Sequence, residues 1–228
     1  TGFEYEKRKH IQEKFLKELS EIGFSNVGRV NLSGSGEPFV SKVFRDFLFT
    51  FDGEKYPKLS VNIQSNGLYF NQENWDRMSK IQSNINEVII SLDASTQETY
   101  SQIRCKGDFN ELINNITFLS TLRKQNKIRR FMLAFVVQKK NFREMIEAIN
   151  IGKQVNVDLF IFNLLNNWGS WSFEEFESNA IWKEYNPDYD EFIDILKDSI
   201  FSDPILDLGN MIEYRNIAIQ KQITESVS

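Results

Sequence analysis

The sequence predicts an α/β fold, namely a partial, open parallel βα barrel of the TIM type with about five strands and a helical C-terminal appendage. Two observations predict it. Short apolar runs alternate with amphipathic helical patterns at intervals of roughly thirty residues, which is typical of βα units in a parallel sheet. Several runs also carry a polar residue at every second position, whereas the strands of a doubly wound sheet are almost continuously apolar. A recurring polar face therefore favours a curved barrel whose lumen can hold a ligand.

Five strands are expected, each preceded by a helix. The strands are expected at residues 29–33, 59–64, 87–92, 130–137 and 158–163, and the helices at Glu6–Ile22, Lys42–Thr50, Glu73–Asn84, Phe109–Lys124 and Phe142–Gln154. Because the order begins with a helix, we expect a strand before residue 1. A complete eight-stranded barrel usually needs about 250 residues.

Polar residues occupy one face of the expected strands. They are Asn31, Ser33, Asn62, Gln64 and Ser91, while Gln138 and Asn163 end the later strands. The barrel is expected to span residues 1–165. Residues 166–228 are rich in acids and aromatics, and we expect an appendage with a helix over Pro187–Ser199, capped by Asn186.

Composition limits the function. The net charge is −5, which gives no global basic field for nucleic acid, although "RKQNKIRR" at 123–130 is a local basic run. That run is either a solvated helix end with its following loop, which we prefer, or a phosphate-binding patch. A single cysteine, Cys105, excludes an internal disulfide, and no apolar run reaches the ~20 residues of a membrane span. The expectation is a cytoplasmic protein without nucleic-acid or membrane partners.

The ends of the expected strands carry the candidate site residues, because ligands gather at the carboxyl edge of parallel sheets. "GSGEP" at 34–38 is either an ordinary turn or a loop in which Glu37 accepts from an ammonium, with Pro38 in the first turn of the next helix. "SNG" at 65–67 is a turn signal. In "SLDAST" at 91–96, Asp93 either faces a ligand or, like Ser95, caps a helix; Arg104 either pairs with a carboxylate at the mouth or is solvated.

Conventional catalysis has little support. His10 is the only histidine and falls in a predicted surface helix, and Cys105 has no predicted base beside it. Neither a Walker loop nor a Rossmann glycine motif follows a strand. No lysine, histidine or carboxylate pair stands at a strand end, as an aldolase or isomerase barrel would need. A polar lumen without an acid–base pair suits a bound cofactor that supplies the chemistry.

Taken in order, the strand ends resemble those of the radical S-adenosylmethionine superfamily, in the branch that often carries a SPASM domain. The resemblance covers roughly residues 5–165. "LSGSGEPF" is similar to its Gly-Gly-Glu-Pro loop, "IQSNG" to its Thr-Asn-Gly strand end, "ISLDASTQETYSQIR" to its Ser-Ile-Asp-Ala-Ser run, and "FVVQKKN" to its fifth strand. Each motif is weak by itself, and the series is strong.

The resemblance implies a set of site residues. Gly34, Ser35, Gly36 and Glu37 would hold the amino end of S-adenosylmethionine, Ser91 would lie near its ribose or carboxylate, Arg104 would pair with that carboxylate, and Val137 and Asn163 would form the adenine wall. Further cofactor-binding positions are Pro38, Asn66 and Asp93, and Asn62, Gln64 and Gln138 would face the substrate. The implied chemistry is reductive cleavage by a 4Fe-4S cluster to a 5′-deoxyadenosyl radical, which abstracts hydrogen from a small-molecule or peptide substrate.

The chain departs from the family at the cluster. The family's Cys-x-x-x-Cys-x-x-Cys loop follows the first strand, and three thiolates cannot come from one cysteine. We expect that the first strand and cluster loop precede this sequence in a longer parent enzyme, which would also need an external reductant. The alternative is a degenerate barrel that acts as a ligand-binding module without redox chemistry.

Overall fold

The computed structural model describes residues 27–33, 36–105, 107–169 and 171–227, together with His10 and Lys14. The predicted helix Glu6–Ile22 lies outside the described residues, except for His10 and Lys14. The predicted site residues Gly34 and Ser35 also lie outside them. Among the described residues, no helix has the length and apolar character needed to cross a membrane.

The described strands form one parallel sheet whose spatial order is the chain order. They are β1 (Arg29–Leu32), β2 (Ser60–Ser65), β3 (Ile85–Ser91), β4 (Arg130–Val137), β5 (Leu159–Leu164) and β6 (Leu206–Asp207). Each strand pairs with the next strand in the chain, and all pairs are parallel. This is the strand order of a βα barrel that is open along one side, so the predicted fold class is confirmed. The sixth strand has only two residues and was too short to predict.

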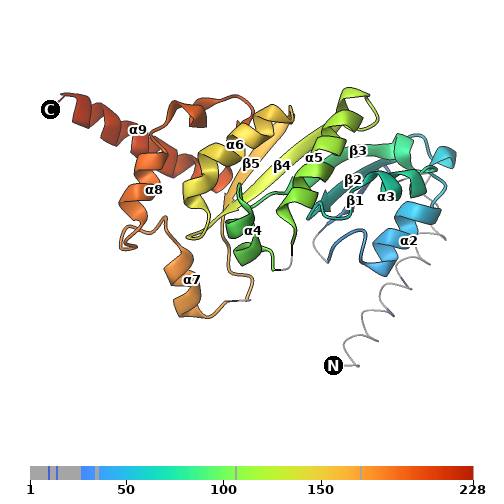
Figure 1. Ribbon diagram of the computed structural model, residues 1–228, viewed down its shortest axis with the longest axis horizontal. Helices are drawn as coiled ribbons and strands as arrows, with labels where there is room; N and C mark the ends of the chain where they lie inside the picture. The colour runs from blue at the N-terminus through green and yellow to red at the C-terminus, as the bar shows by residue number, and fades with distance from the viewer. Residues whose placement is uncertain are drawn as a thin grey trace.

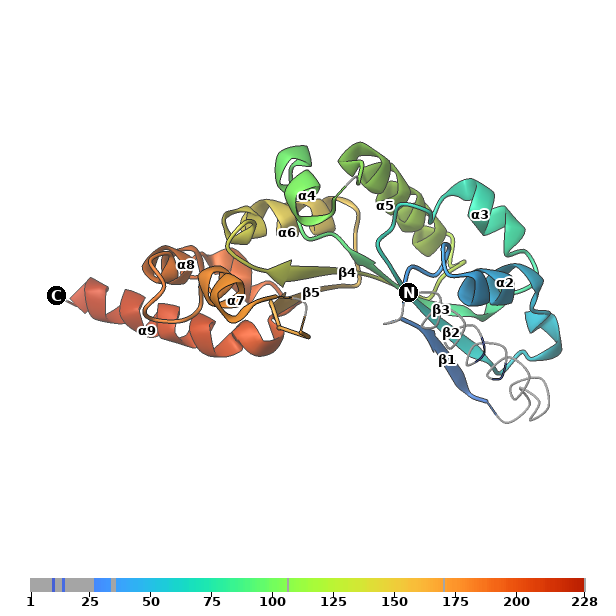
Figure 2. The ribbon, with the colours of Figure 1, turned by 90° about the horizontal axis from the view of Figure 1, so that it is seen from below.

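The helices between strands lie on one face of the sheet, as Figure 1 and Figure 2 show. They are α2 (Lys42–Thr50), α3 (Gln72–Arg77), α4 (Gln97–Ile103), α5 (Phe109–Lys124) and α6 (Met145–Gln154), with short 3-10 turns at Gly53–Lys55, Gln82–Asn84 and Phe142–Glu144. The predicted helix Glu73–Asn84 is therefore too long, because the chain leaves α3 at Met78 and resumes as a 3-10 turn.

The C-terminal part contains α7 (Phe173–Asn179), α8 (Tyr189–Ile195), and α9 (Ile212–Val227), with 3-10 turns at Ser199–Ser202 and Gly209–Met211. The helix predicted at Pro187–Ser199 is shorter than expected. Asn186 does not cap it: its Oδ1 accepts from the amide of Asp188 at 3.0 Å, which closes a turn ahead of the helix. β6 also belongs to the sheet, so the appendage is joined to the barrel by strand pairing with β5.

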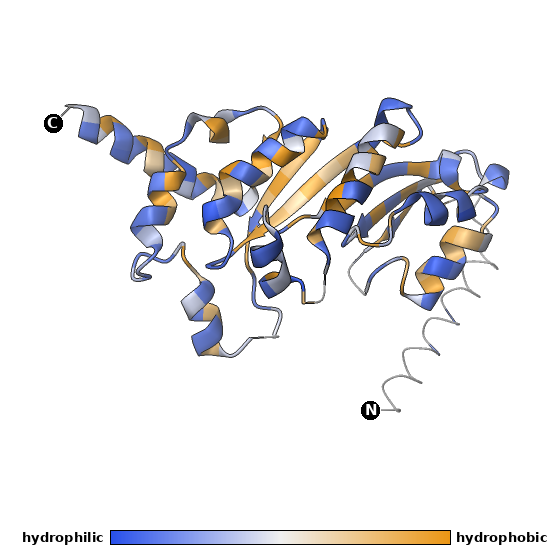
Figure 3. Ribbon diagram, in the orientation of Figure 1, coloured by the Kyte–Doolittle hydropathy of each residue, from blue (hydrophilic) through white to orange (hydrophobic). Residues whose placement is uncertain are grey.

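The core lies between the sheet and α2–α6. Every second strand residue faces it, and Figure 3 shows the apolar stripe along β4 and β5. The strand residues with 0% exposure are Val61, Val88, Ile90, Phe131, Leu133, Phe135, Val137, Phe160 and Phe162. They belong to one cluster with Leu112, Ile116 and Leu119 of α5. Burial of such side chains, each worth about 1.5–3 kcal/mol, fixes the strand register and therefore which residues face the other side.

The opposite face of β1–β3 is polar, as predicted. Asn62 Nδ2 donates to Asn31 Oδ1 at 3.0 Å, and Asn86 Nδ2 donates to Asn62 Oδ1 at 3.2 Å. A β-bulge after Val61 makes Asn86 an additional residue in β3, and its side chain reaches Asn62 of β2. This asparagine ladder satisfies amides that would otherwise need water.

Candidate functional site

A pocket of about 360 Å³ opens where β1, β2 and β3 end. It is lined by Gly36, Glu37, Gln64, Ser65, Asn66, Ser91 and Arg104. All of these except Ser65 are residues that the sequence singled out, and they come from three separate strand ends and from the end of α4. The volume lies at the small end of the range for ligand sites.

Glu37 is held in the pocket by the end of β2. Its Oε1 accepts from the Ser65 hydroxyl at 2.5 Å, and its Oε2 accepts from the Asn66 amide at 2.7 Å. Burial raises the pKa of the Glu37 carboxyl above its ordinary value, although the Ser65 and Asn66 hydrogen bonds oppose that shift. Ionised Glu37 is therefore costly as it stands, and a cationic group beside it would reduce that cost.

The loop that carries Glu37 needs glycine before it. Gly36 has a φ of +127°, which side-chain-bearing residues rarely adopt. Pro38 does not begin a helix, which corrects the prediction. It lies in a turn in which the Glu37 carbonyl accepts from the amides of Val40 and Ser41, and α2 begins only at Lys42. Pro38 does not line the pocket.

The β2 end is braced from behind. Ser65 Oγ accepts from the Gly67 amide at 3.0 Å, and Asn66 Oδ1 accepts from the Leu68 amide at 3.0 Å. Asn115 of α5 donates to the carbonyls of Gly67 and Leu68 at 2.9 and 3.0 Å. The buried Asn115 was not predicted, since nothing in a helical pattern marks an asparagine that binds a distant turn.

Arg104 pairs with Asp93 at the pocket rim. Its Nε donates to Asp93 Oδ2 at 2.9 Å, and its second terminal nitrogen also contacts that oxygen. Asp93 Oδ1 accepts from the Val136 amide at 2.8 Å, so the carboxylate ties Arg104 to β4. Asp93 has a φ of 55° and is only 2% exposed, and it does not line the pocket. Neither Asp93 nor Ser95 caps α4, because Thr96 does so by accepting from the Thr99 amide.

Glu144 fixes the loop between β3 and α4, and it was missed. Its carboxylate accepts from the Ser95 amide at 2.6 Å and from the hydroxyls of Thr96 and Thr99 at 2.7 and 2.5 Å. Burial raises the pKa of Glu144, but these donors outweigh burial and lower it overall. A lone glutamate in a 3-10 turn 45 or more residues away carries no local signal of this role.

The remaining predicted residues lie elsewhere. Val137 is fully buried in the core cluster, and its side chain therefore cannot form an adenine wall in the lumen. Gln138 is only 6% exposed and follows β4, where its amide donates to Asn141 Oδ1. Asn163 is exposed beside Gly209, and Asn62 belongs to the asparagine ladder. None of these four lines the pocket.

The residues present do not fit an iron–sulfur cluster. The sequence contains one cysteine, and the described residues hold no group of three or more potential metal ligands. Cys105 is exposed in the loop after α4. A cluster that leaves one iron open needs three thiolates.

No family model matches the sequence, and no curated protein matches it significantly. Solved structures share the fold, those of TYW1, SuiB and anSMEcpe among them. TYW1, with a lysine-pyruvate adduct bound, is 16% identical, with a TM-score of 0.50 over 86% of this chain and 59% of its own. SuiB from Streptococcus suis is 15% identical, with a TM-score of 0.53 over 86% and 41% of the two chains. The structure of anSMEcpe with bound AdoMet and the Kp18Cys peptide is 18% identical, with a TM-score of 0.50 over 77% of this chain and 46% of its own.

This chain shares its fold with radical S-adenosylmethionine enzymes. These likenesses confirm the predicted fold, and they agree with the order of the strand-end motifs. The chain spans about half the length of these structures, between 41% and 59%.

Proposed function

We propose that the pocket at the carboxyl edge binds the amino-acid end of S-adenosylmethionine, as part of a radical S-adenosylmethionine enzyme. The observation that carries this proposal is the presence of both Glu37 and Arg104 in the lining of one pocket. An α-amino acid presents an ammonium and a carboxylate, and these need an anion and a cation at the same site. Burial raises the pKa of Glu37, and the charge of Arg104 is near enough to oppose that rise slightly.

Each residue has a distinct task in this proposal. Glu37 accepts from the ligand ammonium, while Ser65 and the Asn66 amide hold the carboxylate in one orientation. Arg104 keeps its bond to Asp93 and turns its remaining donors toward the ligand carboxylate. Gly36 lets the ligand approach the backbone closely. Ser91 supplies a hydroxyl at the third strand end.

When bound, S-adenosylmethionine would supply a sulfonium whose carbon–sulfur bond breaks on one-electron reduction, so that methionine leaves as a thioether and the carbon fragment is a radical able to abstract hydrogen. The electron for that cleavage cannot come through residues of this chain, which offers one thiol. We therefore assign the 4Fe-4S cluster, and the contact with an external reductant, to parts of a longer parent protein. The substrate proposed is a small molecule or a peptide; anSMEcpe, which shares the fold, was solved with a peptide bound.

The second candidate is a binding module that holds a ligand without redox chemistry. The single cysteine favours it. The two functions differ in a measurable product: the parent protein, reconstituted with iron and sulfide and then reduced, forms 5′-deoxyadenosine only in the first case.

The binding site itself can be tested on this chain by calorimetric titration with S-adenosylmethionine and S-adenosylhomocysteine. We expect Glu37→Gln to weaken S-adenosylmethionine at least tenfold. Glu98→Gln makes the same chemical change on an exposed residue of α4 outside the pocket and should leave affinity within twofold. Equal affinities for wild type and Glu37→Gln would contradict the assignment.

A further inference from the structure

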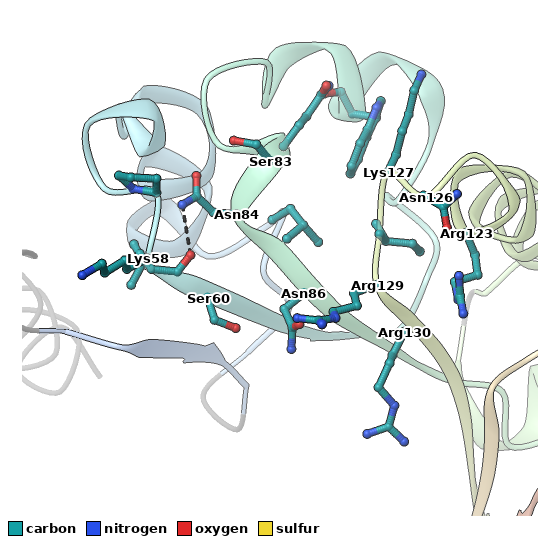
Figure 4. Close-up of a pocket in the computed structure, with 16 residues that line it drawn as sticks. Lys58, Ser60, Ser83, Asn84, Asn86, Arg123, Asn126, Lys127, Arg129 and Arg130 are labelled. Carbon is teal, nitrogen blue, oxygen red and sulfur yellow. Dashed lines mark hydrogen bonds between the residues drawn. The ribbon is translucent and has the colours of Figure 1, made fainter.

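A second, larger cavity lies at the opposite, amino edge of the sheet. It has a volume of about 1000 Å³ and is bounded by the segments that lead into β2, β3 and β4. Figure 4 draws its sixteen lining residues. Five of them are lysines or arginines, and none is an aspartate or glutamate. We call this cavity the basic basin.

Two of the five cations are neutralised from outside the basin. Arg123 donates to both carboxylate oxygens of Asp158 at 2.7 and 2.9 Å. Arg130 donates to Glu87 at 3.1 Å. The other three, Lys58, Lys127 and Arg129, form no ion pair with any residue in the described ranges. The basin therefore presents uncompensated positive charge.

The segment that carries two of these free cations is held rigidly. α5 ends in a Schellman motif: the Asn126 amide donates to the Arg123 carbonyl at 3.0 Å, and the Lys127 amide donates to the Leu122 carbonyl at 2.9 Å. Asn126 takes the left-handed position, with a φ of 57°. The Arg129 amide then donates to the Asn86 carbonyl at 3.1 Å. The basic run is the exposed end of α5 with the loop after it, as the preferred interpretation has it, and it also forms an ordered wall of a cavity.

The third such cation, Lys58, lies on the β2 side of the basin, across from Lys127 and Arg129, and Figure 4 shows its side chain extending outward at the rim. Lys58 lies in a loop that Asn84 clamps by donating to the carbonyls of Tyr56 and Leu59 at 2.9 and 3.0 Å. Asn84 is only 4% exposed, so the clamp is part of the core boundary. Charge is thus placed on two sides of the basin by two separately braced loops.

We propose that the basic basin binds a small, multiply charged phosphate, namely a di- or triphosphate group. Lys127 and Arg129 on one wall, with Lys58 at the opposite rim, provide the positive charge that an anion of high charge density needs, and Ser60 and Ser83 line the same cavity as further donors. The volume is that of a small-molecule site. A nucleic-acid strand is disfavoured because the chain carries a net charge of −5, which repels a long polyanion away from the basin. The proposal does not rest on the function of the carboxyl-edge pocket.

The test is a calorimetric titration of the whole chain with sodium triphosphate at low ionic strength. We expect one binding event that weakens as sodium chloride is added. Lys127→Gln and Arg129→Gln should each weaken binding at least fivefold, and the double variant should abolish it. Lys124→Gln removes the same charge from the last turn of α5 outside the basin, and it should change affinity less than twofold. Thermal unfolding establishes that each variant is folded.

Two results would overturn the proposal. The first is equal weakening by Lys124→Gln and Lys127→Gln, which would mean that only net charge matters. The second is a single-stranded RNA ten-mer that binds more than tenfold tighter than triphosphate, which would assign the basin to nucleic acid. The proposal is supported if ATP binds as tightly as triphosphate. Tighter binding of ATP also supports it and would indicate additional contacts to the nucleoside.

Discussion

The two edges of the sheet treat charge in opposite ways. At the carboxyl edge, Glu37 already accepts from Ser65 and Asn66, and Arg104 already donates to Asp93. At the amino edge, the side chains of Lys58, Lys127 and Arg129 form no ion pair with any described residue. One site is held together by its own functional groups, whereas the other exposes them.

Because of this difference, we expect substitutions of charged residues at the two edges to change the free energy of unfolding by different amounts. Removing a charge from the carboxyl edge leaves another buried group unpaired, which is expensive. Removing a free surface cation from the amino edge leaves nothing unpaired. At the carboxyl edge the same residues therefore stabilise the fold and form the proposed ligand site, whereas at the amino edge the proposed ligand-binding residues contribute little to stability.

The largest effect is expected from Asp93→Ala. It leaves Arg104 and the Val136 amide without their acceptor and places alanine at a φ of 55°. Breaking a buried pair from one side costs about 3–5 kcal/mol, and the partial exposure of Arg104 favours the lower end, about 3 kcal/mol. The measurement is the free energy of unfolding in urea. Asp46→Ala, which breaks the exposed pair with Lys42, should cost about 1 kcal/mol or less. Similar losses for both variants would contradict the coupling at the carboxyl edge.

A smaller loss, about 1.5 kcal/mol at pH 7, is expected from Glu144→Gln, because three donors to a charged acceptor are weakened. Since folding lowers the pKa of Glu144, its stabilising contribution is present above the ordinary value of 4.5 and is lost as pH falls through the lower folded value. The difference in urea midpoint between wild type and Glu144→Gln should thus shrink toward acidic pH. A difference that grows toward acid would show that another group dominates.

The stabilising contribution of Glu37 should change with pH in the opposite direction to that of Glu144. Folding raises its pKa, so its contribution to stability is most favourable below the ordinary value of 4.5 and falls as pH rises through the raised folded value. Relative to Glu37→Gln, the wild type should therefore lose stability in that window. Saturating S-adenosylmethionine should reduce the loss, because its ammonium favours the ionised carboxyl. A pH-independent difference between the two proteins would contradict the burial of Glu37.

Much of the fold could be predicted from the sequence, because the apolar period and the βα spacing are local patterns. β4 was predicted at residues 130–137 and is found there, and α5 has the predicted bounds. Glu37, Asn66 and Arg104 line one pocket. The strand-end rule brought Glu37 and Asn66 to the same edge but left ordinary turns as an alternative, and the cofactor-binding role of all three was implied by the resemblance and stays a prediction.

What could not be predicted depends on partners far away in the chain. Glu144 and Asn115 stabilise loops more than 40 residues away, and no local signal distinguishes them from surface residues. Val137 was assigned to the lumen although it continues the core-facing alternation of β4. The basic run at 123–130 becomes a cavity wall only once the loops before β2 and β3 stand opposite it.

The smallest effect sharpens the comparison most. Asn126 and Asn156 occupy the same left-handed position after α5 and α6, with φ values of 57° and 54°, and both helices end in the same hydrogen-bond pattern. Alanine at either position should cost about 1 kcal/mol, because asparagine tolerates the left-handed region better than alanine, whose side chain cannot hydrogen-bond to the local backbone. Only Asn126→Ala should also weaken triphosphate binding, by about threefold, because Lys127 and Arg129 follow it directly into the basin. Glycine at position 126 should restore affinity. If Asn156→Ala weakened triphosphate equally, the loss would reflect general loosening of the barrel, and the amino edge would be coupled to the fold in the same way as the carboxyl edge.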